Sequence, residues 1–239
     1  MKTAQELFDE AEELYEQMKH KEAAKLYEAA LAIDRAFMDA YEGIISSYNL
    51  LEQYEKVIYW SDKSLEVSPT YQPGLAGKGN ALRAMGKITE AIAYYDFAIK
   101  LHPDLGFLYD GKAGCLEDAD RREEALECHI KNSELDPQNA LPYANAAVCC
   151  QVMEKYDAAI EYINKALALD PHNPLYFIDR ARVYELQGHK AEAIQDYKAA
   201  QAALNSGELD GKLDDKTKVE VRKWIKEGLG QRSSCCNLF

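Results

Sequence analysis

Five histidines and one glycine-rich hexapeptide are the residues whose types could support catalysis in this chain. The hexapeptide GLAGKG at 74–79 resembles a phosphate-binding loop, but it lacks the G-x-x-x-x-G-K-[ST] spacing and lies in a segment with helical periodicity. Neither H-E-x-x-H nor G-x-S-x-G occurs. The histidines share no recognisable site with a cysteine and an acid; they are His20, His102, His129, His172 and His189. We therefore predict that the protein is not an enzyme, and we expect neither a metal ion nor a cofactor.

Four of the six cysteines, Cys115, Cys128, Cys149 and Cys150, lie inside segments with helical periodicity. Their spacing matches no metal-site rule and no small disulfide framework. Cysteine packs well as a small apolar residue when its thiol stays reduced. We expect these four to be free, buried thiols in a reducing compartment.

The other two cysteines belong to the last five residues, and Cys236-Asn237-Leu238-Phe239 reads as a C-a-a-X lipidation box. Cys235 is a candidate for a second acyl chain, which would turn marginal membrane binding into stable binding. A basic patch has the same effect, and basic residues lie just upstream: Lys216, Lys218, Arg222, Lys223, Lys226 and Arg232. Asn237 is not aliphatic, so an unmodified flexible tail over 230–239 stays open as the alternative. Lipidation also requires a eukaryotic cytosol, the protein's own or a host's.

The overall charge narrows the class of partner. The chain has 28 Lys and Arg against 41 Asp and Glu, a formal charge of −13. Phosphate recognition draws on clustered Lys and Arg, so the charge argues against nucleic acid as a partner. The first residues carry no apolar run typical of a leader, and no run of about 18 apolar residues occurs that could cross a membrane. These features favour a cytoplasmic protein.

A repeat of 34 residues organises the chain. Pro69, Pro103, Pro137 and Pro171 follow one another at that interval, and small residues keep the same phase at Ala91, Ala125, Ala159 and Ala193. A period in this range indicates stacked supersecondary units. Cutting at the proline interval gives six units: 4–37, 38–71, 72–105, 106–139, 140–173 and 174–207. Each unit holds two segments with apolar residues at i, i+3, i+4 and i+7, so the sequence predicts an all-α fold.

These units resemble the tetratricopeptide repeat over about 85% of the chain. The family places large apolar residues at position 4 and small ones at 8, 20 and 27, with proline at 32. Here position 4 reads Leu7, Tyr41, Leu75, Tyr109, Tyr143 and Phe177. Arg35 and Asn205 replace the proline in the first and sixth units, as terminal units often do. The resemblance implies a right-handed superhelical solenoid of antiparallel helix pairs. The segment 212–229 is the expected capping helix, because an end unit needs a cover for its open apolar face.

The same resemblance implies a concave groove lined by the first helix of each unit, through positions 2, 5, 6, 9, 12 and 13. It would bind another protein as a peptide or a helix, with basic side chains towards the acidic first units. Candidate groove residues are Glu12, Glu42, Ser46, Asn49, Asn80, Arg83, Asp110, Asn145, Gln151, Asp179 and Arg182. The expected role is a non-enzymatic scaffold or adaptor. A lipid-tethered adaptor that recruits its partner to a membrane is the alternative.

Two further features of the groove leave alternatives open. Gly43, Gly77 and Gly111 all stand at position 6, where glycine costs about 0.5–1 kcal/mol relative to alanine in a helix. They either deepen a channel for a ligand or remain from duplication of an ancestral unit. Some tetratricopeptide domains hold the C-terminal carboxylate of chaperones with a clamp of Lys, Asn and Arg. In this chain Asn80 has Ala76 where the clamp needs Lys, so a co-chaperone role is less favoured.

Overall fold

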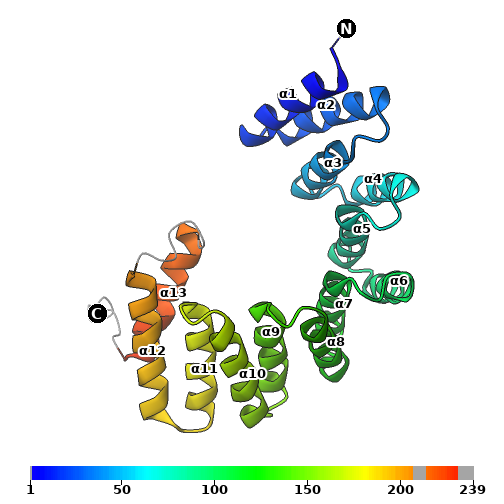
Figure 1. Ribbon diagram of the computed structural model, residues 1–239. Helices are drawn as coiled ribbons and strands as arrows, with labels where there is room; N and C mark the ends of the chain where they lie inside the picture. The colour runs from blue at the N-terminus through cyan, green and yellow to red at the C-terminus, as the bar shows by residue number, and fades with distance from the viewer. Residues whose placement is uncertain (1, 207–213, 231–239) are drawn as a thin grey trace, which may run out of the picture. The chain divides into compact units, whose positions relative to one another are not determined.

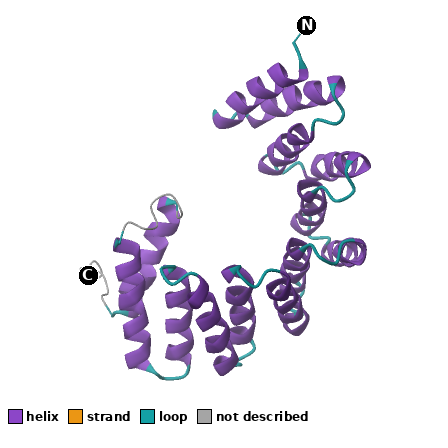
Figure 2. Cartoon of the chain, viewed as in Figure 1, coloured by secondary structure: helices purple, strands orange, loops and turns teal. Residues whose placement is uncertain are grey.

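The computed structural model describes residues 2–206 and 214–230, and all regular structure in those ranges is helical (Figures 1 and 2). The chain divides into two compact units, Met1–Arg121 and Arg122–Phe239. The helices of the first unit are α1 (Ala4–Glu16), α2 (His20–Ile33), α3 (Met38–Leu50), α4 (Tyr54–Val67), α5 (Gln72–Ala84), α6 (Ile88–Leu101) and α7 (Gly106–Asp118). Those of the second are α8 (Arg122–Leu135), α9 (Ala140–Val152), α10 (Tyr156–Leu169), α11 (Pro174–Leu186), α12 (Lys190–Asn205) and α13 (Asp215–Gly228).

Within each unit, consecutive helices pack side by side and reverse direction at short turns, as α11 and α12 do in Figure 1. The odd-numbered helices from α1 to α11 begin at residues 4, 38, 72, 106, 140 and 174, and the even-numbered helices from α2 to α12 follow the same interval of 34. The four evenly spaced prolines fall just after α4, α6, α8 and α10, because proline cannot continue a helix. The all-α prediction is confirmed.

One turn residue in each helix pair has left-handed backbone geometry. Four of the six are not glycine: Met18, Glu52, Asp120 and Glu154 have φ between 55° and 62°. The equivalent turns at Gly86 and Gly188 use glycine, which adopts positive φ without a Cβ clash. The left-handed turn therefore recurs every 34 residues, whether or not the residue at that position is glycine.

Local capping signals set several helix starts. Thr3 and Glu6 form a capping box at α1, in which each side chain bonds the backbone N–H of the other residue. Asn173 accepts a hydrogen bond from the backbone N–H of Leu175 at 3.1 Å, and Asp214 accepts one from that of Thr217 at 2.7 Å. These contacts satisfy N–H groups that a helix start leaves without an intrahelical acceptor.

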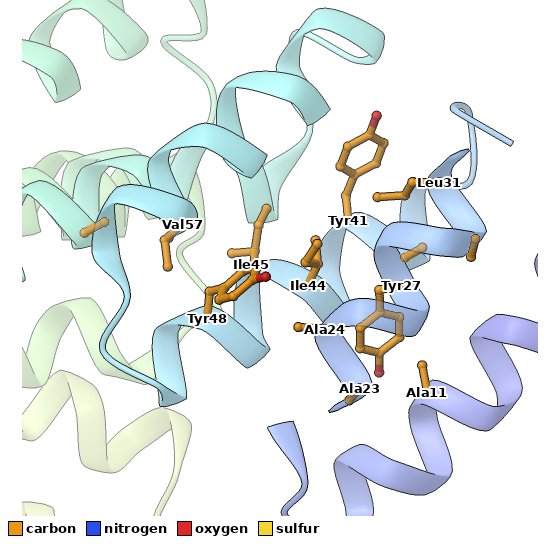
Figure 3. Close-up of a cluster of buried hydrophobic side chains, with 13 residues drawn as sticks. Ala11, Ala23, Ala24, Tyr27, Leu31, Tyr41, Ile44, Ile45, Tyr48 and Val57 are labelled. Atoms are coloured by element: carbon orange, nitrogen blue, oxygen red, sulfur yellow. The ribbon is translucent and has the colours of Figure 1, made fainter. Parts of the chain in front are cut away.

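Small buried residues let the helices of a pair approach closely. Ala23, Ala91, Ala125 and Ala159 are each 0% exposed. In the first unit, Ala11 and Ala23 lie beside the ring of Tyr27, and Ile45, Tyr48 and Val57 continue the same buried cluster (Figure 3). The small residues kept by the 34-residue period are therefore core contacts between helices.

The last helix, α13, packs on the second unit's α11 and α12. Val221 and Ile225 of α13 are 0% and 2% exposed, and they share a buried cluster with Ile178 and Tyr197. We propose that α13 is the cap expected from 212–229. Its helical residues are Asp215–Gly228, while 212 and 213 lie outside the described part of the chain.

Candidate functional site

Two adjoining hollows lie between α3 and α5 of the first unit. The first has a volume of about 660 Å³ and the second about 630 Å³, and both are bordered by Asn49 and Asn80. We call them together the α3–α5 trough. Because consecutive helices alternate in direction, α3 and α5 run parallel. The trough therefore passes from the N-terminal ends of both helices, at Asp39 and Gln72, towards their C-terminal ends, at Leu50 and Ala84.

Five of the predicted groove residues line this trough. Glu42 and Ser46 border the first hollow, Arg83 borders the second, and Asn49 and Asn80 border both. Glu12 and Asp110 of the same unit line neither hollow. Five residues that were predicted from separate helices thus lie together between α3 and α5.

Arg83 does not present a free positive charge to the trough. Its Nε donates to Asp118 Oδ2 at 2.5 Å and its Nη2 to Oδ1 at 3.0 Å, so the two groups form a bidentate pair. Arg83 also lies against Gly114, where a Cβ would come within 2.5 Å of Nη1. The neighbouring carboxylate raises the pKa of Arg83 further. The guanidinium of this candidate groove residue therefore links α5 to α7.

Tyrosines from even-numbered helices reach three acceptors on the odd-numbered ones. The Tyr27 hydroxyl donates to Glu12, the Tyr95 hydroxyl to Asn80 Oδ1 at 3.0 Å, and the Tyr197 hydroxyl to Glu185 Oε2 at 3.0 Å. Because Asn80 Oδ1 already accepts one hydrogen bond, the amide nitrogen of Asn80 is the group with two donors to offer a ligand.

The glycines at position 6 make room for these tyrosines. A Cβ at Gly43 would overlap the ring of Tyr27, and one at Gly111 would overlap the ring of Tyr95. Neither interpretation from the sequence anticipated that the glycines accommodate tyrosine rings. One explained them by a channel for a ligand and the other by duplication of an ancestral unit. Gly77 differs, because it faces Ser61 instead of a tyrosine and lines the first hollow.

Several residues that line the trough were absent from the sequence prediction. Asp39 and Pro73 stand at position 2 of their units, Ala76 at position 5 and Asp118 at position 13. All of these positions belong to the groove implied by the family resemblance, so the repeat positions alone could have identified these residues. Tyr71 gave no such signal, because it precedes α5.

In the second unit, the predicted residues lie on α9 and α11. Asn145 and Gln151, both on α9, are half-buried. Asp179 Oδ1 is 3.6 Å from Arg182 Nη1, and the Arg182 guanidinium lies 4.8 Å from the centre of the Trp224 ring of α13. Burial raises the pKa of Asp179 to about 6, against the opposing effect of Arg182.

This shift predicts a pH-dependent cost to the fold. The ordinary pKa of Asp179 is 3.8, so the folded chain holds the proton more tightly than the unfolded chain does. The contribution of Asp179 to stability is then greatest below pH 3.8 and is lost as the pH rises through about 6. Asp179→Asn should raise the free energy of unfolding at pH 7 by up to about 3 kcal/mol and have little effect near pH 3.5.

Denaturant titrations at both pH values check this prediction. Glu161→Gln, which replaces an exposed carboxylate on α10, is the matched control and should give no such difference. An equal effect of Asp179→Asn at both pH values would contradict the stated pKa.

The cysteines agree with their sequence assignment where the structure describes them. Cys115, Cys128, Cys149 and Cys150 are buried thiols that belong to no disulfide. Burial raises the pKa of the Cys115 thiol to about 11, so it stays protonated at neutral pH. Cys235 and Cys236 lie outside the described residues, as does the lipidation box they belong to. No helix in the described part of the chain is long and apolar enough to cross a membrane.

Comparison with known proteins supplies independent support for the repeat. Tetratricopeptide repeat models match residues 74–105 and 140–173. A comparison with curated protein sequences gives no match. Residues 140–173 coincide with the fifth predicted unit, and 74–105 fall within the third.

Solved structures share the fold at low sequence identity. Yeast Tom70 is 17% identical with a TM-score of 0.72, over 88% of this chain and 43% of that one. Cut9 in the Cut9–Hcn1 hetero-tetramer of the APC/C is 17% identical with a TM-score of 0.62, over 94% and 42%. MamA from Desulfovibrio magneticus RS-1 is 15% identical with a TM-score of 0.56, over 70% and 95%. With its 34-residue helix pairs and two direct family matches, the chain is a tetratricopeptide repeat protein.

Proposed function

We propose that the protein is a non-enzymatic scaffold that binds a polypeptide segment of a partner in the α3–α5 trough. The trough itself is the observation that carries the proposal, because it gathers five of the predicted groove residues, all polar or charged, from two parallel helices in one open concave site. Glu42 and Asn49 are exposed, and each lies on the trough side of α3. Amide and carboxylate groups of this kind bind the backbone and basic side chains of a peptide.

Quantitative affinity purification tests this function. The variant Glu42→Lys/Asn49→Arg changes the charge and bulk of the trough at two exposed positions, so it should fold normally. We expect it to lose at least ten-fold in recovery of one or more direct partners. Glu55→Lys, at an exposed position on α4 that lines neither hollow, is the matched control. Full recovery of every partner by the trough variant would rule out this site.

A second proposal, compatible with the first, is attachment to a membrane through Cys236. The supporting observation is that α13 exposes Lys216, Arg222, Lys223 and Lys226, which precede the lipidation box in the sequence. Anionic headgroups attract such a patch and add to the effect of one lipid chain.

Intact mass and membrane fractionation in eukaryotic cells test the attachment. Wild-type protein should gain the mass of an isoprenoid and enter the membrane fraction, whereas Cys236→Ser should do neither. Unmodified wild-type protein in the supernatant would end this proposal without affecting the first one.

A further inference from the structure

The joint between α4 and α5 is built differently from the equivalent joints on either side of it. Tyr27 of α2 faces Gly43 of α3, and Tyr95 of α6 faces Gly111 of α7. Ser61 of α4 stands at the equivalent position and faces Gly77 of α5. The first two joints are thus filled by a phenol ring whose hydroxyl reaches the groove side, and the α4–α5 joint has no such ring.

Larger aliphatic side chains take part of the space that the ring leaves. Ile45 and Val57 stand where the tyrosine-filled repeats have Ala11 and Ala23, or Gly79 and Ala91. Ile45 Cγ2 would lie 3.0 Å, and Val57 Cγ1 3.7 Å, from a Cβ built on Gly77. Figure 3 shows these two side chains in the cluster that also contains Tyr27.

As a result, the first hollow of the trough has an apolar floor. Ile45, Val57 and Gly77 line it, together with Ala76 and Pro73. Beneath Gly77, the Ser61 hydroxyl is 0% exposed and has no hydrogen-bond partner among the described residues. Ser46 is equivalent to Glu12 and Asn80, which accept hydrogen bonds from Tyr27 and Tyr95. In the described part of the chain, no tyrosine hydroxyl bonds Ser46 in this way. The floor therefore suits an apolar group brought from outside.

The rim of this hollow is negatively charged. Asp39 and Glu42 are both exposed, and neither has an ion-pair partner within the described residues. Tyr71 lies beside them and donates a hydrogen bond to the backbone oxygen of Met38 at 2.8 Å. Burial, and then the negative charges of Glu42 and Asp39, raise the pKa of Tyr71 to about 12. Residues 1–121 hold 13 Lys and Arg against 22 Asp and Glu, so the field of the whole unit favours a cation.

We infer that the α3–α5 trough selects a partner segment in which a bulky apolar side chain lies within two residues of a Lys or Arg. The apolar side chain packs on Ile45, Val57 and Gly77. The cation meets Glu42 and Asp39. Glu42 precedes Ile45 by three residues on α3, a rise of about 4.5 Å, which lies between the spacings of about 3.3 Å and about 6.6 Å that separate residues one and two apart in an extended ligand. The Asn80 amide nitrogen donates to a carbonyl of the same segment.

This inference rests on the proposed peptide-binding function and adds the chemistry of the ligand. The test therefore begins with selection of dodecapeptides from a random phage-displayed library on the full chain. Selected peptides are then synthesised with a fluorescein label, and their Kd values are measured by fluorescence anisotropy. We expect the selected sequences to share the apolar–basic pair.

Three variants locate the bound peptide. Ile45→Ala/Val57→Ala/Ser61→Tyr installs the arrangement of the neighbouring joints and fills the floor with a tyrosine, so Kd should rise at least ten-fold. Ala76→Phe, at a half-buried position on α5, narrows the same hollow and serves if the triple variant does not fold. Glu42→Gln should raise Kd about five-fold for the wild-type peptide and leave Kd unchanged for a peptide whose basic residue is replaced by norleucine. Glu55→Gln, outside the trough, should change nothing.

The outcomes separate the two levels of the proposal. Peptides that lack the apolar–basic pair, or that bind the floor-filling and Glu42→Gln variants as tightly as wild type, would overturn the inferred specificity. If such peptides still lose affinity in the Glu42→Lys/Asn49→Arg variant, the scaffold function stands without this specificity. Failure to select any peptide would contradict groove binding itself.

Discussion

Replacing Tyr95 by alanine is expected to lower the free energy of unfolding by about 3–5 kcal/mol, the range for removing a large buried side chain. Tyr95 is 1% exposed, and its ring is enclosed by Gly79 of α5 and Gly111 of α7. Since neither glycine has a side chain that could move into the space, the cavity should stay open. Its hydroxyl bond to Asn80 is lost as well. Urea titration followed by circular dichroism measures the change.

A second substitution at this site, Gly111→Ala, gives a sharper test, because we expect it to destabilise one background and stabilise the other. In the wild-type background Gly111→Ala should destabilise, because its Cβ would overlap the Tyr95 ring and overpacking costs about 1–3 kcal/mol. In the Tyr95→Ala background it should stabilise by about 0.5–1 kcal/mol, the ordinary gain of alanine over glycine in a helix. An effect of the same sign in both backgrounds would mean that the ring is not what requires the glycine.

Ile225→Ala should cost the second unit about 2–5 kcal/mol. Ile225 is 2% exposed and packs from α13 into the cluster that contains Ile178 and Tyr197. Removing it opens a cavity between α13 and the helices that α13 covers, so the end of the unit should unfold more readily. Hydrogen exchange should be faster throughout α12 and α13.

Val219→Ala on the same helix is the matched control, because Val219 is 61% exposed. It should leave both the exchange rates and the unfolding midpoint almost unchanged. Equal effects of the two substitutions would show that α13 does not act as a cap through its buried face.

Much of the fold could be predicted because the information is periodic. The prolines at 69, 103, 137 and 171 mark helix ends that are repeated by the same local chemistry, and the small residues mark close helix contacts. The family resemblance then placed Glu42, Ser46, Asn49 and Asn80 on helix faces that line the trough. The structural role of each of these residues could be predicted from its own position in the repeat, without reference to any other residue.

What could not be predicted depends on pairs of residues in different repeats. The Tyr95 ring explains Gly111, sixteen residues later, and Asp118 neutralises Arg83, thirty-five residues earlier. Reading each position on its own presented Arg83 as a candidate groove residue and left Gly111 with two interpretations, a ligand channel or an inherited residue. The hollow over Gly77 depends on several residues at once, since Ser61, Ile45 and Val57 of the preceding repeat all differ from their equivalents in the tyrosine-filled repeats.

The left-handed turns have a consequence for protein engineering. Met18, Glu52 and Glu154 adopt a backbone conformation that costs a residue with a side chain about 1–2 kcal/mol, and Gly86 shows that the same turn closes with glycine. Glycine would relieve that strain at a smaller entropic penalty in the unfolded chain. Glu52 lines the far end of the α3–α5 trough, whereas Met18 and Glu154 do not line it. Glycine substitutions at residues 18 and 154 should therefore raise the stability of the chain. They could make an unstable trough variant stable enough to purify without altering what it binds.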